Sequence, residues 1–93
     1  MIVEHKAKGG LIKFDIEIKN SKIKDVKITG DFFIYPEDSV FALERKLRGK
    51  TEKESMEIIK DYLRTVEALG ITIEDFKNLL KKAFEDKDAV QSN

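Results

Sequence analysis

Few residues in this chain have the types and spacing that catalysis or metal binding requires. The only histidine among the 93 residues is His5, which lies in a predicted strand with no nucleophile beside it. A histidine needs a partner and a pocket to act as a base, so we interpret His5 as a half-buried strand residue. The sequence contains no Cys, which excludes a thiol nucleophile, a disulfide and Fe–S ligation by cysteine. No metal-ligand spacing occurs either, so we expect no catalytic and no metal-binding residues.

Two short segments have compositions that could contact a phosphate group. Gly9-Gly10 lacks the surrounding pattern of a phosphate-binding loop and reads as a hairpin turn. Four basic residues gather at the end of a predicted helix: Arg45, Lys46, Arg48 and Lys50. Their charge is favourable at the negative end of the helix dipole, which is one explanation of the cluster. The other is contact with a phosphate or an acidic partner, and the sequence leaves open whether these side chains approach a nucleotide.

The segment from Gly30 to Pro36 joins a strand-like half of the chain to a helical half. A glycine followed by an acid can form a sharp bend, because glycine adopts positive φ at little cost and Asp31 can accept hydrogen bonds from backbone N–H groups. Four apolar residues follow the bend: Phe32, Phe33, Ile34 and Tyr35. Phe32 and Phe33 are adjacent, so in an extended segment they point to opposite sides and one of them needs a second cover. The four residues are therefore either all core or, in part, a surface that docks a partner.

The charge balance argues against nucleic acid and anionic membranes as partners. Charged residues make up 39% of the chain, but 18 basic and 18 acidic side chains cancel. No apolar run approaches the length of a membrane span and no signal peptide is visible, so we expect a cytoplasmic protein. The length predicts one domain over residues 1–93.

Alternating hydrophobicity predicts three strands before the bend. They cover residues 1–8, 11–19 and 23–30, with turns at Gly9-Gly10 and Asn20-Ser21. The even-numbered residues from Ile12 to Ile18 are apolar and the odd ones are charged, which is typical of an antiparallel sheet with one buried face. Ile23 is out of phase with the apolar residues that follow it, and a bulge near Lys24-Asp25 would restore the pattern.

After Pro36 the hydrophobic period becomes that of helices. The start and stop signals are Glu37 to Ser39 and Gly49 for the first helix, Thr51 with Glu54 and Gly70 for the second, and Thr72 with Asp75 and Phe84 for the third. The apolar stripe of the second helix includes Val66 and Leu69, and residues 85–93 are predicted to be a frayed tail. The predicted fold is α+β, a two-layer domain with a three-stranded antiparallel sheet covered on one face by three helices.

Three segments form a more specific pattern: Gly9 to Ile12, residues 23–33 with the sequence I-K-D-V-K-I-T-G-D-F-F, and residues 43–49 with the sequence L-E-R-K-L-R-G. This succession of a glycine hairpin, a strand exit and a helix end resembles the C-terminal domain of lipoate–protein ligases, over residues 5–84. In most bacterial ligases that domain follows a large catalytic domain. In some archaea it is a separate small polypeptide, and this chain resembles that accessory subunit.

The resemblance implies that the partner is the large catalytic subunit, in a heterodimer. That subunit binds ATP and lipoate and carries a catalytic lysine and an R-R-x-x-G-G-G motif, none of which this chain has. The chain should therefore neither catalyse alone nor bind a cofactor alone. The family activates lipoate to lipoyl-AMP and transfers the lipoyl group to a lysine of an acceptor domain, and the small domain is needed for the activation. The resemblance places the partner interface at Phe32, Phe33, Ile34 and Tyr35, with Gly30 and Asp31 forming the turn.

The same strand exit also resembles Fe–S assembly scaffolds of the IscU and SufE type, which share this general fold. Those proteins carry functional cysteines where this chain has phenylalanine, so the resemblance implies the fold and not the cluster. The alternative function is a stand-alone protein–protein interaction or adaptor domain. An independent enzyme would require a converging acid–base pair in a deep pocket.

Overall fold

The computed structural model describes residues 1–85, which form the three predicted strands and three predicted helices in order, together with two short strands that the sequence did not predict. In chain order the elements are β1 (Ile2–Ala7), β2 (Gly10–Lys19), β3 (Lys22–Gly30), β4 (Ile34–Tyr35), α1 (Ser39–Leu47), α2 (Glu52–Arg64), β5 (Glu67–Ala68) and α3 (Ile73–Phe84). The tail predicted at residues 85–93 lies, from residue 86 on, outside the described residues. None of the described helices is both long and apolar enough to cross a membrane.

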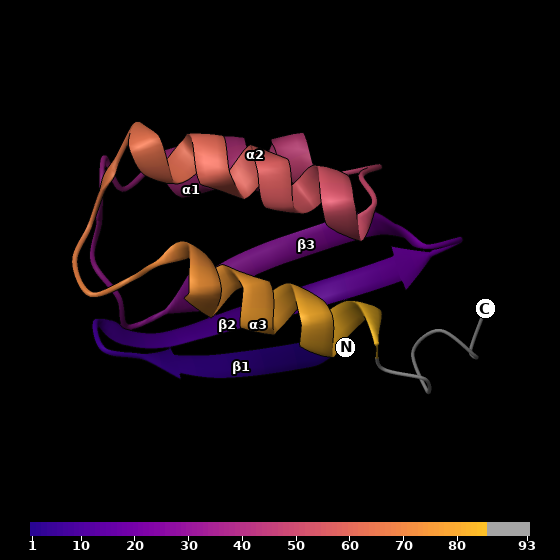
Figure 1. Cartoon of the computed structure of the whole chain (residues 1–93), viewed down its shortest axis with the longest axis horizontal. Coiled ribbons are helices and arrows are strands. Elements are labelled where there is room, and N and C mark those ends of the chain that lie inside the picture. The colour runs from indigo at the N-terminus through magenta and orange to yellow at the C-terminus, as the bar shows by residue number, and fades with distance from the viewer. Residues whose placement is uncertain (86–93) are drawn as a thin grey trace.

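The main sheet has the predicted antiparallel order β1-β2-β3 (Figure 1). The even-numbered residues from Ile12 to Ile18 are buried, because successive side chains of a strand point to opposite faces. Glu17 pairs with Asp25 and Ile18 pairs with Ile23, so Lys24 is the extra residue of the predicted bulge. The bulge is confirmed, and it returns Ile23 to the buried face.

The first hairpin turn lies one residue earlier than predicted. Ala7 pairs with Gly10, so the connecting residues are Lys8 and Gly9 rather than Gly9 and Gly10. Gly10 is a strand residue with a φ of 133°, a conformation that favours glycine. Its missing side chain also makes room for Asp31, whose backbone would collide with a Cβ at this position.

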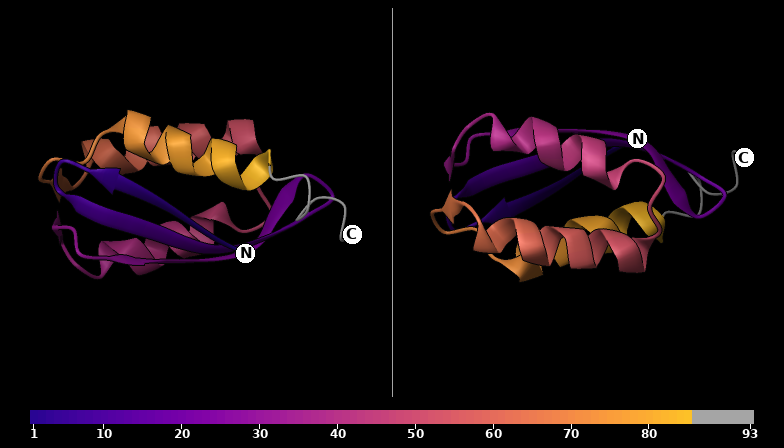
Figure 2. Two further views of the ribbon diagram at one scale, coloured as in Figure 1. Left: turned by 90° about the horizontal axis from the view of Figure 1, so that it is seen from below. Right: turned by 90° about the horizontal axis from the view of Figure 1, so that it is seen from above.

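The three helices close over the buried face of the sheet and complete the predicted α+β two-layer fold (Figure 1 and Figure 2). Helix α3 lies against β1 and β2, and α2 lies between α3 and α1. Helix α1 packs against β3. It also covers the outer edge of this strand, because a Glu44 carboxylate oxygen accepts a hydrogen bond from the Ile28 N–H at 2.7 Å.

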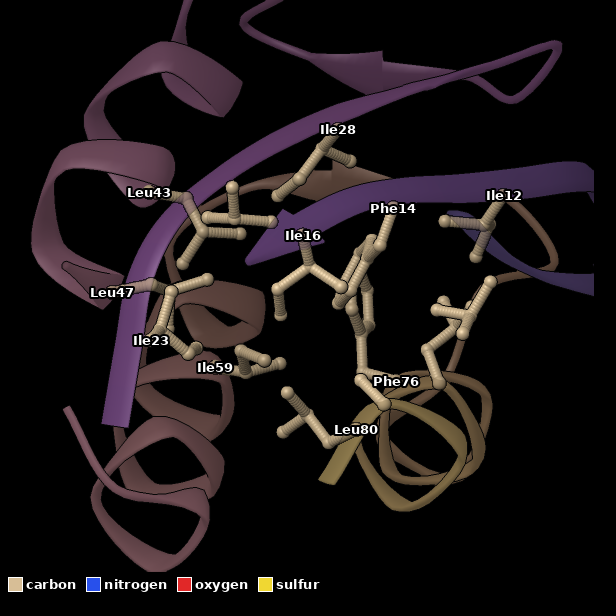
Figure 3. Close-up of a cluster of buried hydrophobic side chains, with 14 of the residues drawn as sticks. Ile12, Phe14, Ile16, Ile23, Ile28, Leu43, Leu47, Ile59, Phe76 and Leu80 are labelled. Atoms are coloured by element: carbon tan, nitrogen blue, oxygen red, sulfur yellow. The ribbon is translucent and has the colours of Figure 1, made fainter. Parts of the chain in front are cut away.

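One core connects all of these elements (Figure 3). Side chains of β2 meet Leu43 and Leu47 of α1 on one side and Phe76 of α3 on the other. The rings of Phe14 and Phe76 have centroids 6.0 Å apart at an interplanar angle of 41°, a tilted aromatic pair. Both rings are fully buried, so they tie the sheet to α3 at its centre.

The second helix is shorter than predicted. It ends at Arg64 and not near Gly70, and the following residues Glu67–Ala68 form β5, which pairs with β4. Val66 and Leu69 continue the apolar spacing of α2 and therefore led to the prediction of a longer helix, but Leu69 is 63% exposed. Pairing with β4 gives this backbone hydrogen-bond partners that are distant in sequence, and such tertiary pairing overrides a local hydrophobic pattern.

Candidate docking surface

The bend after β3 is held against β2 by Asp31. The Asp31 N–H donates to the carbonyl oxygen of Leu11 at 3.1 Å, and an oxygen of the Asp31 carboxylate accepts a hydrogen bond from the Leu11 N–H. Gly30 has a φ of 145°, and a Cβ there would collide with the Leu11 carbonyl oxygen. These contacts fix the direction in which the chain leaves the sheet.

The segment after the bend pairs with residues that follow α2. Ile34 pairs with Ala68 and Tyr35 pairs with Glu67. Beyond this short ladder the Leu69 N–H donates to the Phe33 carbonyl oxygen at 3.3 Å. Leu69, which the sequence placed in a helix, is thereby brought beside Phe33.

Four exposed apolar side chains gather around this ladder and the start of α1. They are Phe33, Tyr35, Phe41 and Leu69, with exposed fractions of 46%, 61%, 62% and 63%. Phe33 and Tyr35 are two residues apart in extended backbone and therefore share a side of it, while Phe33 and Phe41 line the same hollow of about 480 Å³. We call these four residues the aromatic patch. Several large apolar side chains exposed in one region are typical of an interaction site.

The structure separates the four residues that the sequence proposed for the partner interface. Phe33 and Tyr35 are exposed, and Phe32 is half-buried against the core. Ile34 is 4% exposed and belongs to the core, so its assignment to the interface is corrected: its side chain points inward from β4, between two residues that point outward. Phe41 was missed, although its position off the apolar stripe of α1 was a signal.

His5 is half-buried, as predicted, and has an acidic partner that the sequence did not indicate. Its Nε2 lies 2.7 Å from Oδ1 of Asp75, although the two residues are 70 positions apart. The other Asp75 carboxylate oxygen accepts the Thr72 N–H at 2.8 Å, within the capping box of α3. Burial by itself raises the pKa of Asp75, but the hydrogen bonds from Thr72 and His5 outweigh it and hold the pKa below its usual value. The pair therefore joins β1 to the start of α3. The Asp75 carboxylate also caps this helix by accepting the Thr72 N–H.

The basic residues at the end of α1 make different contacts. The Arg48 side chain donates to the Asp25 carboxylate at 3.1 Å, and the Lys50 carbonyl oxygen accepts the Ile23 N–H at 2.8 Å. Arg45 and Lys46 are exposed in the last turn of α1, where positive charge complements the helix dipole. Within residues 1–85, no three side chains of the types that ligate metals converge on one point.

Fold and surface together define a class: a small α+β domain with an exposed apolar patch at one end of its sheet. A family model described as "Bacterial lipoate protein ligase C-terminus" matches residues 1–80. The chain is 43% identical over 77 residues to "Lipoate-protein ligase A subunit 2" of Thermoplasma acidophilum, which covers 82% of each protein. The chain belongs to the lipoate protein ligase C-terminal family.

A solved structure supports the same assignment. It is described as an archaeal lipoylation system from Thermoplasma acidophilum, comprising a bi-partite lipoate protein ligase and its E2 lipoyl domain. One of its chains is similar to this one with a TM-score of 0.77 and 40% identity, covering 86% of this chain and 94% of that chain. The two chains are therefore similar in amino-acid sequence as well as in fold.

Proposed function

We propose that this chain is the non-catalytic accessory subunit of a two-chain lipoate–protein ligase. It acts with a large catalytic subunit in the ATP-dependent activation of lipoate to lipoyl-AMP, the first half of protein lipoylation. The observation that carries the proposal is the 43% identity to a subunit of such a ligase over 82% of both proteins. ATP and lipoate are bound by the catalytic subunit, and the lipoyl group then passes to an acceptor domain that this chain does not need to contact.

The contribution of this chain is pre-organisation of the catalytic subunit. A docked surface that binds the competent conformation of a mobile site better than the incompetent one shifts the population toward competence. The gain equals the difference in binding free energy between the two conformations, so it requires a surface with specific complementarity rather than mere proximity.

The aromatic patch is the docking surface in this proposal. Aromatic side chains dominate the binding energy of protein interfaces because they bury much area at a small cost in side-chain entropy. Phe33 and Phe41 extend from separate elements, and the ladder between β4 and β5 fixes the backbone beneath Phe33. A surface on fixed backbone loses little conformational entropy on binding.

The test measures lipoyl-AMP formation by the candidate catalytic subunit with and without this protein. We expect strong stimulation by the wild type, and a decrease of about thirty-fold or more in apparent affinity for Phe33→Ala, the size of an interface hot spot. Ile2→Ala is the matched control, because Ile2 is a similarly exposed apolar residue (58%) outside the aromatic patch.

Each outcome has a distinct meaning. Stimulation that survives Phe33→Ala, Tyr35→Ala and Phe41→Ala would keep the accessory role but move the interface elsewhere. No stimulation and no co-elution of the wild-type proteins would refute the accessory role and favour a stand-alone adaptor domain.

A further inference from the structure

The hollow beside the aromatic patch is lined mainly by apolar residues and by two acidic ones. It lies where the end of β3, the bend and the start of α1 meet, with a volume of about 480 Å³. Phe33 and Phe41 supply its aromatic surface, and Glu37 and Asp38 lie among its lining residues. No lysine or arginine is among the residues that line it.

The sequence around the hollow is acidic although the whole chain is neutral. The 93 residues contain 18 basic and 18 acidic side chains, yet residues 28–44 contain Asp31, Glu37, Asp38 and Glu44 and no lysine or arginine. Two of these four acids already accept a backbone hydrogen bond: Asp31 accepts from the Leu11 N–H, and Glu44 accepts from the Ile28 N–H. The remaining two are Glu37 and Asp38, the acids that line the hollow.

Glu37 and Asp38 lie at the start of α1, where negative charge is favourable for the helix dipole, but their carboxylates have no bonding partner in the described part of the chain. Neither carboxylate makes a hydrogen bond or an ion pair within residues 1–85. Asp38 occupies the N-cap position of α1, where an aspartate normally accepts a backbone hydrogen bond, but its side chain makes none. Both side chains are exposed and thus available to a partner.

We propose that this hollow receives a lysine or arginine side chain of the catalytic subunit, a proposal that rests on the accessory function proposed above. The aliphatic part of such a side chain would lie against Phe33 and Phe41, as long basic side chains do on apolar surface. The charged end would meet Glu37 and Asp38, and the aromatic faces add a cation–π attraction. A lining of aromatic and carboxylate side chains is complementary to a cation.

The same electrostatics argues against a small-molecule role for the hollow. ATP and lipoate are both anionic, and two carboxylates in a lining that contains no lysine or arginine would repel them. The hollow is therefore a site for a protein side chain, and the ligands of the reaction stay with the catalytic subunit.

The test is the dissociation constant of the complex between this chain and the catalytic subunit, measured by titration calorimetry at two salt concentrations. The variant Glu37→Gln/Asp38→Asn keeps the shape of both side chains and removes both charges. We expect it to weaken binding by about ten-fold or more at low salt and to reduce the salt dependence of binding. The matched control is Glu52→Gln/Glu57→Gln, which removes the same charge at a hollow near Ser21, the opposite end of β3.

Thermal unfolding of both variants checks that each remains folded, which the absence of internal bonds to Glu37 and Asp38 leads us to expect. Wild-type affinity of Glu37→Gln/Asp38→Asn, or an equal loss in the control, would overturn the cation site while leaving the accessory function intact. Failure of the wild-type protein itself to bind or to stimulate the catalytic subunit would overturn both proposals.

Discussion

Gly9 and Gly70 lie in direct contact, and the Gly9 N–H donates to the Gly70 carbonyl oxygen at 2.9 Å. The contact joins the turn between β1 and β2 to the segment between β5 and α3. A Cβ at Gly9 would overlap the Leu69 carbonyl oxygen, and a Cβ at Gly70 would lie 2.5 Å from the Gly9 nitrogen. Leu69, a member of the aromatic patch, thus takes its position from a backbone contact that only glycine permits.

The first prediction concerns this contact. Gly9→Ala should lower the free energy of unfolding by about 2 kcal/mol or more, because two backbone segments must separate to admit the methyl group. Gly49→Ala is the control, since Gly49 has a φ of 79° but a Cβ there would meet nothing within 4 Å. It should cost only the strain of the left-handed conformation, about 1 kcal/mol. Urea unfolding of both variants makes the comparison, and equal losses would contradict the steric explanation.

The second prediction distinguishes two neighbouring residues, Phe33 and Ile34. Ile34→Ala removes a core side chain that is 4% exposed and should cost about 2–5 kcal/mol of stability. Phe33→Ala removes a side chain that is 46% exposed and should change stability by about 0.5 kcal/mol or less, while it weakens binding to the catalytic subunit. Thermal unfolding and a binding assay on both variants check this. If Ile34→Ala weakened binding without loss of stability, the inward assignment of Ile34 would be wrong.

The third prediction concerns the pH dependence of stability. The pKa of Asp75 is held below its usual value of 3.8 in the folded protein, so the unfolded state takes up a proton first as the pH falls. The ionised Asp75 carboxylate contributes fully to the free energy of unfolding at a pH above the pKa that it has in the unfolded state. This contribution is lost as the pH falls from about that value through the lower pKa of the folded state. Asp75→Asn should therefore cost about 1–2 kcal/mol at pH 7 and progressively less below pH 4.

Chemical denaturation of the wild type and Asp75→Asn across this pH range tests the sign. Asp61→Asn is the control, because the Asp61 side chain is 78% exposed and pairs with Arg64 only at 3.7 Å. Asp61→Asn should change the free energy of unfolding little, both at pH 7 and below pH 4. A loss for Asp75→Asn that grew as the pH fell below about 4 would contradict a lowered pKa of Asp75 in the folded protein.

The fourth prediction concerns the outer edge of β3. Glu44→Ala leaves the Ile28 N–H without its acceptor at 2.7 Å and should cost about 1–3 kcal/mol. Glu44→Gln retains an oxygen acceptor and should cost less. Because an uncovered edge strand can pair with another chain, Glu44→Ala should also associate more readily, which light scattering would detect. Equal stability of the alanine and glutamine variants would show that the bond contributes little.

The amino-acid sequence determined the features that depend on neighbouring residues. Alternation in β2 predicted its buried face, and the phase of Ile23 predicted the bulge at Lys24. The capping boxes beginning at Thr51 and Thr72 both form as their spacing indicates. Each of these features is set within a few residues by side-chain direction or by a local hydrogen bond, so the sequence contains the necessary information.

The tertiary structure decided the features that depend on distant segments. Only the folded chain pairs Ile34 with Ala68, sets Leu69 beside Phe33 and places His5 against Asp75. It also decided which apolar residues of the bend are core, because the direction of Ile34 follows from the ladder with β5. Hydrophobic periodicity wrongly assigned Leu69 to a helix. The spacing of apolar residues contains no information about a backbone hydrogen-bond partner that is distant in the sequence.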